Sequence, residues 1–246
     1  MHGTTTDNIE HKSTGWLHGN LSEKGIEQSI KLREQINLNE IDLVISSDLK
    51  RAIDSAKYTF KDSKVILHDK RIRECNYGDL NGEDTSLVKY EEHIDSKFPN
   101  GESLKEVEKR LRNFCEYLLK SYNGKTIALV SHIGHSIAPV FISKFLVENK
   151  VKVKKLIFVC GFNNYLGINE EYDAVNKSMY FDNLEDVKKY ANEIICFYSD
   201  NDPYVRYETE KDFADKIATE QVFISNAGHI NSESGYDTFE DIVSYL

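Results

Sequence analysis

The sequence predicts an α/β fold, a three-layer α/β/α arrangement with a mostly parallel sheet. Short apolar runs alternate with helical patterns along the chain, which is typical of strands joined by crossover helices. The apolar runs are unbroken, so we expect strands that helices cover on both faces. The chain has 246 residues, of which 40% are hydrophobic and 29% charged, and such a chain can bury the core of a globular protein.

Six short runs of aliphatic and β-branched residues predict the strands of this sheet. In chain order they are Ile41–Ser46, Lys64–His68, Thr126–Ile133, Lys155–Cys160, Glu193–Tyr198 and Gln221–Ser225. The basic stretch Asn149–Lys155, before the fourth strand, is predicted to be a solvated connector.

Helices are predicted between the strands. The clearest is Ser103–Ser121, because Ser103 and Glu106 match a capping box and apolar residues recur at spacings of three and four. Ser22 is the predicted N-cap of an earlier helix. The remaining helices are expected at Asp48–Phe60, Ser136–Val147, Leu184–Ala191, Val205–Ala218 and Phe239–Tyr245.

The composition indicates which partners to expect. The net charge of −10 repels nucleic-acid phosphates, so we expect a small-molecule substrate and no nucleic acid. No apolar window reaches the roughly 18 residues of a membrane span, and the N-terminus carries no signal-peptide pattern. We therefore expect a cytoplasmic chain without a membrane partner.

The four cysteines also indicate a reducing compartment. Cys75, Cys115, Cys160 and Cys196 form no C-x-x-C motif, and none stands at zinc-ligand spacing from a histidine. We expect free thiols, and neither a metal nor another cofactor.

Four motifs in the first half carry chemistry. They read HGTTTDN (2–8), SSDLKRA (46–52), RIRECNYG (71–78) and VSH (130–132). Together with GWLHGNLSEKGIEQ (15–28) and FPNGESLKEVEKR (98–110), they resemble the phosphoglycerate-mutase-like branch of the histidine phosphatase superfamily. The resemblance covers residues 1–132.

The resemblance implies a role for each motif. His2 attacks a phosphoryl group and becomes phosphohistidine, which splits one displacement into two. His132 and Arg51 neutralise the phosphoryl oxygens, and Asn8 helps to hold the phosphate. Glu74 gives a proton to the leaving oxygen and then activates water, and no metal is required.

This half departs from the family pattern at its start. Met1 stands where the family has an arginine, and the strand that leads to the first histidine is missing from the sequence. Because chain termini fray unless they are tied down, we expect His2 to be poorly anchored.

The second half resembles another family. GHSIA (134–138), LIFVCGF (156–162), YSDNDPYV (198–205) and NAGHIN (226–231) are similar to the small serine hydrolases of the α/β-hydrolase superfamily. The resemblance covers residues 133–246, which correspond to the C-terminal part of such a domain.

This second resemblance implies a catalytic triad. Ser136 is the nucleophile at a strand-to-helix turn, and the backbone N–H of Ile137 is an oxyanion donor. His229 takes the serine proton, and Asp202 orients His229. Asp200 is a rival for the acid, but Asp202 is preferred because it precedes a proline, as in the family pattern.

In both families the strand at residues 126–133 leads into a helix, so we expect the two halves to share it. The predicted sheet order is 65–68, 41–46, 126–133, 155–160, 193–198 and 221–225, all parallel, in one merged domain. An unpaired edge at 65–68 or 221–225 offers a route to a homodimer.

Three functions remain open. The preferred one is a serine hydrolase that acts on a small ester, amide or thioester through Ser136, His229 and Asp202. The alternative is a phosphomonoesterase that works through phosphohistidine at His2. The third is a recombined or truncated chain with both sites inactive, since each half lacks an N-terminal segment of its relatives.

Overall fold

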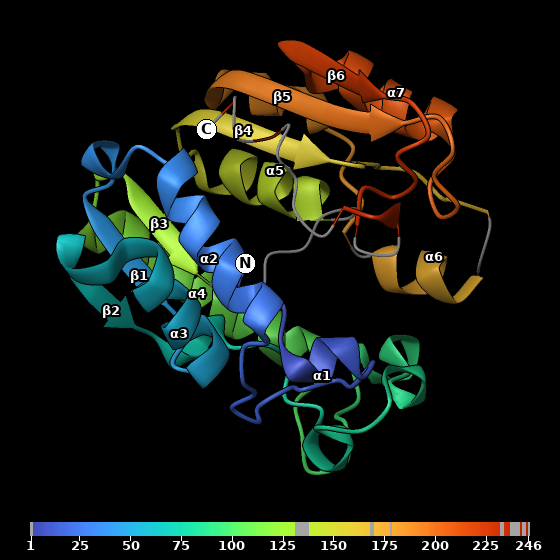
Figure 1. Cartoon of the computed structure of the whole chain (residues 1–246). Helices are drawn as coiled ribbons and strands as arrows, with labels where there is room; N and C mark the ends of the chain where they lie inside the picture. Colours follow the sequence, from blue (N-terminus) through green and yellow to red (C-terminus); the bar gives the residue numbers. More distant parts are fainter. Residues whose placement is uncertain are drawn as a thin grey trace. The chain divides into compact units, whose positions relative to one another are not determined.

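The computed structural model describes residues 2–130, 138–167, 170–177, 179–231, 234–236, 242 and 245. They belong to two compact units, Met1–His132 (the N-terminal unit) and Ile133–Leu246 (the C-terminal unit). Each unit combines helices with a three-stranded parallel sheet (Figure 1). The predicted α/β class is confirmed, and the units divide at the predicted boundary between the two halves.

The predicted single six-stranded sheet is wrong. The described strands form two sheets, ordered β2-β1-β3 and β4-β5-β6. The strand expected to be shared contributes β3 (Ile127–Val130), which pairs with β1 (Leu43–Ser46) in the N-terminal sheet. Side chains of its own unit pack against each sheet.

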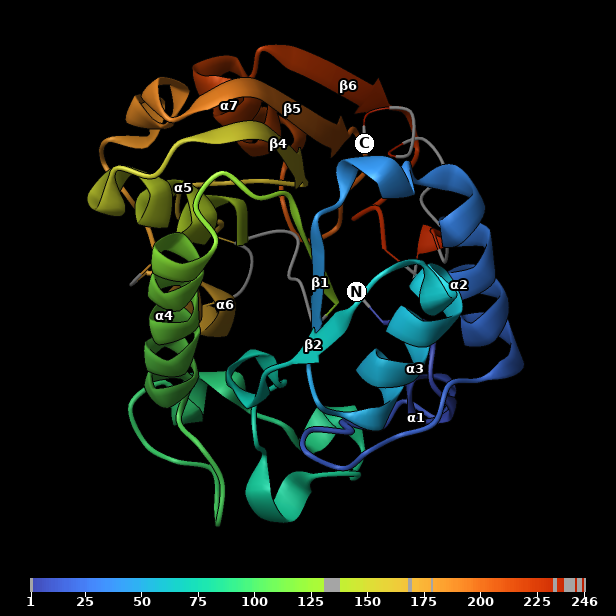
Figure 2. The ribbon, with the colours of Figure 1, turned by 90° about the vertical axis from the view of Figure 1, so that its left-hand side faces the viewer.

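The N-terminal unit has three layers. Val44 of β1 and Val130 of β3 pack against Phe60 on one face of the sheet, whereas Ile45 packs against Phe114 on the other. Figure 2 shows α3 and α4 on opposite sides of β1 and β2. The other elements are α1 (Thr6–Ile9), α2 (Glu23–Gln35), α3 (Lys50–Phe60), β2 (Ile66–His68) and α4 (Leu104–Ser121), with short 3₁₀ turns at Leu38–Glu40, Lys61–Ser63, Lys70–Ile72, Gly78–Leu80, Thr85–Leu87 and Tyr90–His93.

Helix caps in this unit follow the sequence prediction. Ser22 caps α2 by accepting a hydrogen bond from Gly25 N. Ser103 and Glu106 form the predicted capping box at the start of α4. In both cases a side-chain oxygen satisfies a backbone N–H that has no partner within the helix.

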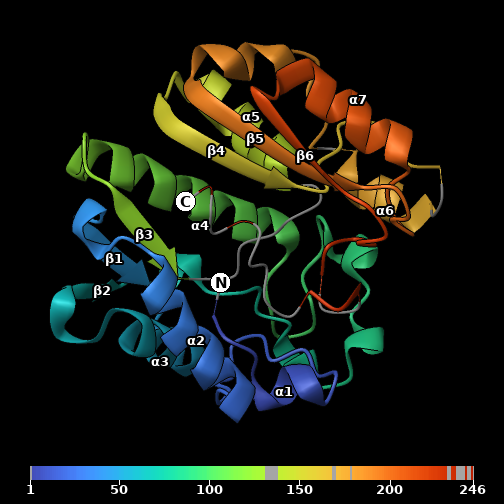
Figure 3. The same ribbon diagram turned by 45° about the horizontal axis from the view of Figure 1, so that its top comes forward.

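The C-terminal unit contains the second sheet, in which β5 is the central strand (Figure 3). Phe158 of β4 packs edge-on against Phe213 of α7, and Ile195 and Phe197 of β5 pack on Ile230. The elements are α5 (Ala138–Asn149), β4 (Val153–Val159), α6 (Glu170–Asn176), a 3₁₀ segment (Leu184–Lys189), β5 (Ala191–Ser199), α7 (Tyr207–Ile217) and β6 (Glu220–Ile224).

Two local predictions for this unit need correction, and a third concerns residues that the structure mostly does not describe. The basic connector 149–155 is partly strand, because Val153 and Lys155 pair with β5. The segment Leu184–Ala191 is a 3₁₀ turn that runs into β5 rather than an α-helix, and α6 had no predicted counterpart. The helix predicted at Phe239–Tyr245 lies mostly outside the described residues.

Two findings bear on the expected environment. The four cysteines are free thiols, of which Cys115 alone is half-buried and the others are buried. Within the described residues, no helix is both long and apolar enough for a membrane span.

Two glycines let the first residues of the chain lie directly on α2. A Cβ atom on Gly3 would stand 2.2 Å from Gly25 O, and one on Gly25 would stand 2.1 Å from Thr4 O. Backbone meets backbone at this point, so neither neighbour can move away cheaply. The close approach places the segment that begins at His2 against the helix.

We expect Gly25→Ala to lower the free energy of unfolding by about 1–3 kcal/mol, because the new methyl group overpacks a backbone contact. In an unconstrained helix the same change stabilises by about 1 kcal/mol, so the sign is diagnostic. Urea denaturation measures the effect. Glu27→Ala, an exposed change on the same helix, should stay within about 0.5 kcal/mol of wild type. Equal stability of Gly25→Ala and wild type would show that the backbone of residues 3 and 4 does not lie against Gly25.

Candidate active sites

His2 begins a segment that neighbouring helices hold in place. Gly3 N donates to Ser55 Oγ at 2.9 Å, and Thr4 N donates to Gln28 Oε1 at 2.9 Å. The expectation of a poorly anchored His2 is therefore wrong. Side chains of α2 and α3 bind the backbone directly after His2, and this restrains a residue that stands next to the terminus.

A histidine, a guanidinium and a carboxylate meet in the N-terminal unit. Arg51 Nε donates to His2 Nε2 at 3.3 Å, and Arg51 Nη2 donates to Glu74 Oε2 at 2.7 Å. His2 Nδ1 lies 2.8 Å from Gly3 O. Because a carbonyl oxygen can only accept, Nδ1 carries the proton and Nε2 keeps its lone pair. A nucleophilic histidine needs this tautomer.

Arg51 is 1% exposed and is surrounded by acceptors. Nη1 donates to Leu17 O at 2.7 Å, and Nη2 donates to Gly15 O at 2.9 Å in addition to Glu74. Burial lowers the pKa of Arg51, and the Glu74 carboxylate opposes that shift. The guanidinium stays charged and holds three separate segments around one positive centre.

Glu74 is fixed from its other side and through its backbone. Tyr77, which is buried, donates its hydroxyl hydrogen to Glu74 Oε1 at 3.0 Å. From α4, Arg110 donates to the backbone oxygens of Arg71, Arg73 and Glu74 at 2.7–2.8 Å. The loop that carries the carboxylate is thereby attached to the helix.

Some of the predicted phosphatase residues lie together in the structure. A small cavity is lined by His2, Ser47, Leu49, Arg51, Ala52, Ile72 and Glu74. Asn8 is exposed and lies outside this lining; its Oδ1 accepts from Thr5 N at 3.0 Å and caps α1. His132 lies outside the described residues.

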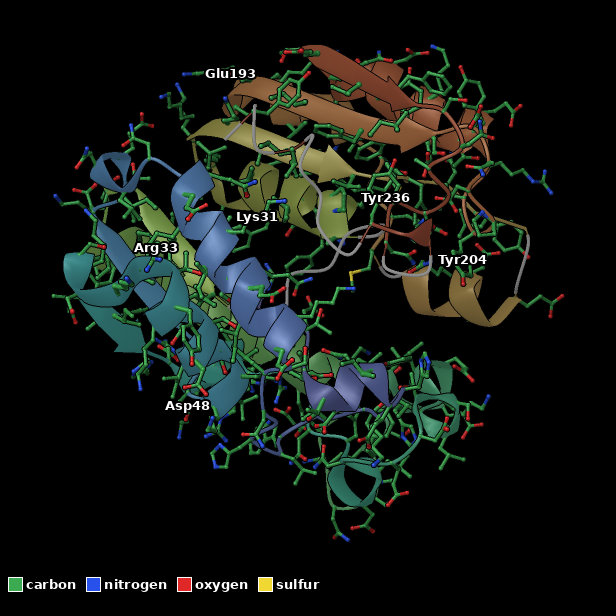
Figure 4. All side chains as sticks on the ribbon, in the orientation of Figure 1. Lys31, Arg33, Asp48, Glu193, Tyr204 and Tyr236 are labelled. Carbon is green, nitrogen blue, oxygen red and sulfur yellow. The ribbon has the colours of Figure 1, made fainter. Side chains whose placement is uncertain are left out.

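The C-terminal unit contains a buried acid–base pair. His229 Nδ1 is hydrogen-bonded to Asp202 Oδ2. Asp202 Oδ1 accepts from Tyr204 N at 2.7 Å and from Val205 N at 2.9 Å. The side chain of Asp202 is fully buried, and the Tyr204 ring, labelled in Figure 4, packs edge-on against the imidazole at 5.2 Å. Three donors thus orient one carboxylate.

Asp200, the rival acid, is engaged elsewhere. Its carboxylate accepts from Ser225 Oγ at 2.9 Å and from Asn226 N at 2.6 Å, on the exposed loop after β6. His229 therefore pairs with Asp202, as preferred from the sequence. Ser136 and Ile137 lie outside the described residues.

A second carboxyl group stands beside the pair. Cys160, Asp202, Glu210 and His229 each contribute one atom to a cluster in which all atoms lie within 4.8 Å of one another. Glu210 is 1% exposed, and its Oε2 accepts from Ser199 N at 3.0 Å. Its Oε1 is buried and has no hydrogen-bond donor among the described residues.

Two buried carboxyl groups at this separation cannot both be charged at neutral pH. Burial, and then the contact with Asp202, raise the pKa of Glu210 to about 9. Burial opposes the charge on Asp202 as well, but the hydrogen bonds with His229 and Glu210 lower its pKa to about 2. Asp202 therefore carries the negative charge and Glu210 the proton.

The same four side chains offer donor types that metal ions use, and among the described residues they are the group with suitable spacing. However, His229 Nδ1 and Asp202 Oδ2 bond to each other. That contact fits an acid–base pair rather than two ligands that face a common ion.

Glu210 was not among the residues singled out from the sequence, although a signal was present. Glu210, Phe213, Ala214 and Ile217 are the buried residues of α7. Their spacing of three and four puts a glutamate on the apolar stripe of an amphipathic helix. A charged residue on such a stripe is unusual unless it is paired or neutral.

Comparison with known proteins finds two families. The profile of the histidine phosphatase superfamily (branch 1) matches residues 2–140, and the profile of the serine hydrolase family matches residues 102–246. The matches overlap at residues 102–140, which include α4 and β3.

Among curated relatives, phosphoglycerate mutase-like protein 4 of Arabidopsis thaliana is 31% identical over 54% of this chain and 64% of its own length. The 2,3-bisphosphoglycerate-dependent phosphoglycerate mutase 2 of Gloeobacter violaceus is 28% identical over 56% of this chain and 70% of its own length. The chain thus spans less than two thirds of the Arabidopsis protein.

Solved structures of a hydrolase and a phosphatase are also similar to part of this chain. Mycobacterial hydrolase 1 is 27% identical with a TM-score of 0.51, over 60% of this chain and 77% of that one. A mycobacterial glucosyl-3-phosphoglycerate phosphatase is 28% identical with a TM-score of 0.50, over 60% and 79%.

We expect Glu210→Gln to flatten the pH dependence of stability. The folded-state pKa of Glu210 lies above its ordinary value of 4.5. Its contribution is therefore complete below about pH 4.5 and is lost as the pH rises toward about 9. Between these limits the wild-type free energy of unfolding should fall more steeply than that of Glu210→Gln, by at most about 1.4 kcal/mol per pH unit.

Urea denaturation at several pH values measures this difference. Glu208→Gln, an exposed change in the first turn of the same helix, should follow wild type. Parallel curves for Glu210→Gln and wild type would contradict the protonated state of Glu210.

Proposed function

Residues 2–140 belong to the histidine phosphatase superfamily and residues 102–246 to the serine hydrolase family, and we propose that the chain is a phosphomonoesterase that works through phosphohistidine at His2. The observation that carries the proposal is one cavity in which Arg51 contacts both His2 Nε2 and Glu74. The relatives named as phosphoglycerate mutases and as a phosphatase support a small phosphomonoester as substrate. The preference drawn from the sequence, serine hydrolase before phosphatase, is thereby reversed.

The reaction has two steps. His2 Nε2 attacks phosphorus, the bond to the leaving oxygen breaks, and protonated Glu74 gives that oxygen its hydrogen. Glu74 then takes a proton from water, whose oxygen attacks phosphohistidine and releases inorganic phosphate. Arg51 balances the charge on the phosphoryl oxygens in both steps.

The salt bridge between Arg51 and Glu74 gives substrate binding a second effect. Arg51 and Glu74 both line the cavity, so phosphoryl oxygens bound there would compete with Glu74 for the guanidinium. Binding of the dianion weakens the hold of Arg51 on Glu74.

We propose serine hydrolase chemistry on a small ester, amide or thioester as the second candidate. The hydrogen bond between Asp202 and His229 favours it, because an ionised Asp202 keeps the imidazole hydrogen on Nδ1 and leaves Nε2 to act as the base. Ser136 is the nucleophile and Ile137 N–H an oxyanion donor in this proposal, as the sequence predicts.

We expect His2→Ala to reduce kcat/KM for p-nitrophenyl phosphate by at least about 1000-fold, because the change removes the nucleophile. Wild type should also form an acid-labile, alkali-stable phosphoryl label that His2→Ala lacks. His11→Asn is the matched control, since His11 is exposed and has a positive φ that asparagine tolerates. Equal turnover of His2→Ala and wild type would remove His2 from the mechanism.

Glu74→Gln provides an independent check in the same assay. General acid catalysis contributes about 100–10,000-fold, and mainly for poor leaving groups. The loss should therefore be larger for an alkyl phosphate than for p-nitrophenyl phosphate. The same loss with both substrates would contradict proton donation by Glu74.

For the second candidate, we expect a fluorophosphonate probe to label Ser136 in wild type and to fail with Ser136→Ala and His229→Ala, because both nucleophile and base are needed. Ser225→Ala, an exposed change in the same unit, should keep the label. Mass spectrometry of the labelled peptide identifies the residue. If folded wild type is not labelled, this candidate is rejected. If wild type shows neither phosphatase nor serine hydrolase activity, the remaining interpretation is a chain in which both sites are inactive.

A further inference from the structure

Glu210 occupies a position that suits a neutral carboxyl group. It lies on the buried face of α7 beside Phe213, and it is 1% exposed. Ser199 N donates to Glu210 Oε2 at 3.0 Å, whereas an ionised Glu210 would leave its buried Oε1 without a donor among the described residues. A buried carboxylate normally needs several donors, because desolvation disfavours its charge.

Protonation gives the Glu210 carboxyl group a way to form a further hydrogen bond. As an acceptor, Glu210 Oε1 finds no donor among the residues that the structure describes. As an O–H donor, the carboxyl group stands next to Asp202, one oxygen of which belongs to the same cluster of atoms within 4.8 Å. A protonated Glu210 can thus donate a hydrogen bond to a carboxylate, and such a bond is stronger than one between neutral groups.

The neighbours decide which carboxyl group is charged. Asp202 accepts hydrogen bonds from Tyr204 N, Val205 N and His229 Nδ1, which stabilise its charge. The titratable groups that face Glu210 are Asp202, His229 and the thiol of Cys160. Burial raises the pKa of Cys160, so the thiol stays neutral and does not compete for the role of anion.

We propose that Glu210 is a proton-bearing positioning residue that donates its carboxyl hydrogen to Asp202 and so holds Asp202 against His229. This inference rests on the proposed serine hydrolase chemistry. A fourth hydrogen bond to Asp202 prevents rotation of the carboxylate, and a fixed carboxylate keeps His229 in one tautomer and one orientation. Ionisation of Glu210 removes that hydrogen bond and places a second negative charge beside Asp202.

The test is the rate of fluorophosphonate labelling of Ser136 from pH 6 to 10 in wild type, Glu210→Gln and Glu210→Ala. Glutamine keeps an N–H that donates to Asp202, so Glu210→Gln should label at the wild-type rate near neutral pH. It should also lack the alkaline decline that wild type shows. Alanine removes the donor and should slow labelling by about 10–100-fold at every pH, the loss typical of such supporting partners.

A glutamine variant that is as slow as the alanine variant at neutral pH would overturn the proposal. An alkaline decline shared by wild type and Glu210→Gln would overturn it as well. Glu208→Gln, exposed on the same helix, is the matched control and should behave as wild type at every pH.

A second readout separates this proposal from the hydrolase function. In NMR spectra, the hydrogen on His229 Nδ1 reports its bond to Asp202 whether or not Ser136 reacts. Its resonance should move as Glu210 ionises in wild type and stay constant in Glu210→Gln. If wild type is not labelled but the resonance moves as expected, the hydrolase function fails and the arrangement of Glu210 stands; a constant resonance in wild type overturns the arrangement.

Binding of Zn²⁺ tests the alternative that the cluster of four side chains is a metal site. If the four groups bind a metal, Zn²⁺ should raise the unfolding temperature of wild type but not of Cys160→Ser, and that result would overturn the proposal. We expect Zn²⁺ to leave both unfolding temperatures unchanged.

Discussion

The N-terminal unit is organised around one buried guanidinium. Arg51 stands in the first turn of α3, just after β1, so a strand-to-helix junction fixes its position. A cation at 1% exposure is stable only when acceptors surround it, and Gly15 O, Leu17 O and Glu74 supply them. On the Nε side, Arg51 donates to His2. Lysine could not replace this residue, because only a planar guanidinium donates in several fixed directions at once.

In the C-terminal unit the buried ionisable groups are acidic rather than basic. Cys160 follows β4, Asp202 follows β5 and His229 comes after β6, and these strands are parallel neighbours. Their carboxyl ends therefore meet at one edge of the sheet, which brings together groups far apart in the sequence. Glu210 joins them from the first turn of α7. Hydrogen bonds from backbone N–H groups make one carboxylate acceptable there, and protonation makes the second one acceptable.

The sequence predicted those features that depend on local pattern. The Ser103–Glu106 capping box and the strand cores follow from the spacing of residues, whereas the pairing of Asp202 with His229 follows from the resemblance to the serine hydrolase family. It did not predict what holds His2, because Gly25 and Ser55 act through contacts with backbone that is distant in the sequence. The four pairs of neighbouring strands within the two sheets were predicted as the structure has them, whereas the expected pairing of 126–133 with 155–160 is not found among the described strands. A strand sequence specifies that a strand forms, whereas long-range packing selects the neighbour with which it pairs.

That distinction accounts for the overlap of the two family matches at residues 102–140. A strand followed by a helix satisfies the local requirements of both families, so the same residues match both profiles. The hydrogen bonds of β3 are to β1, and the division between units falls after His132. By this division His132 belongs to the unit that holds His2, Arg51 and Glu74, whereas Ser136 belongs to the unit that holds Asp202 and His229. The described partners of each predicted chemistry therefore lie within a single unit, His2, Arg51 and Glu74 in the first and Asp202 and His229 in the second.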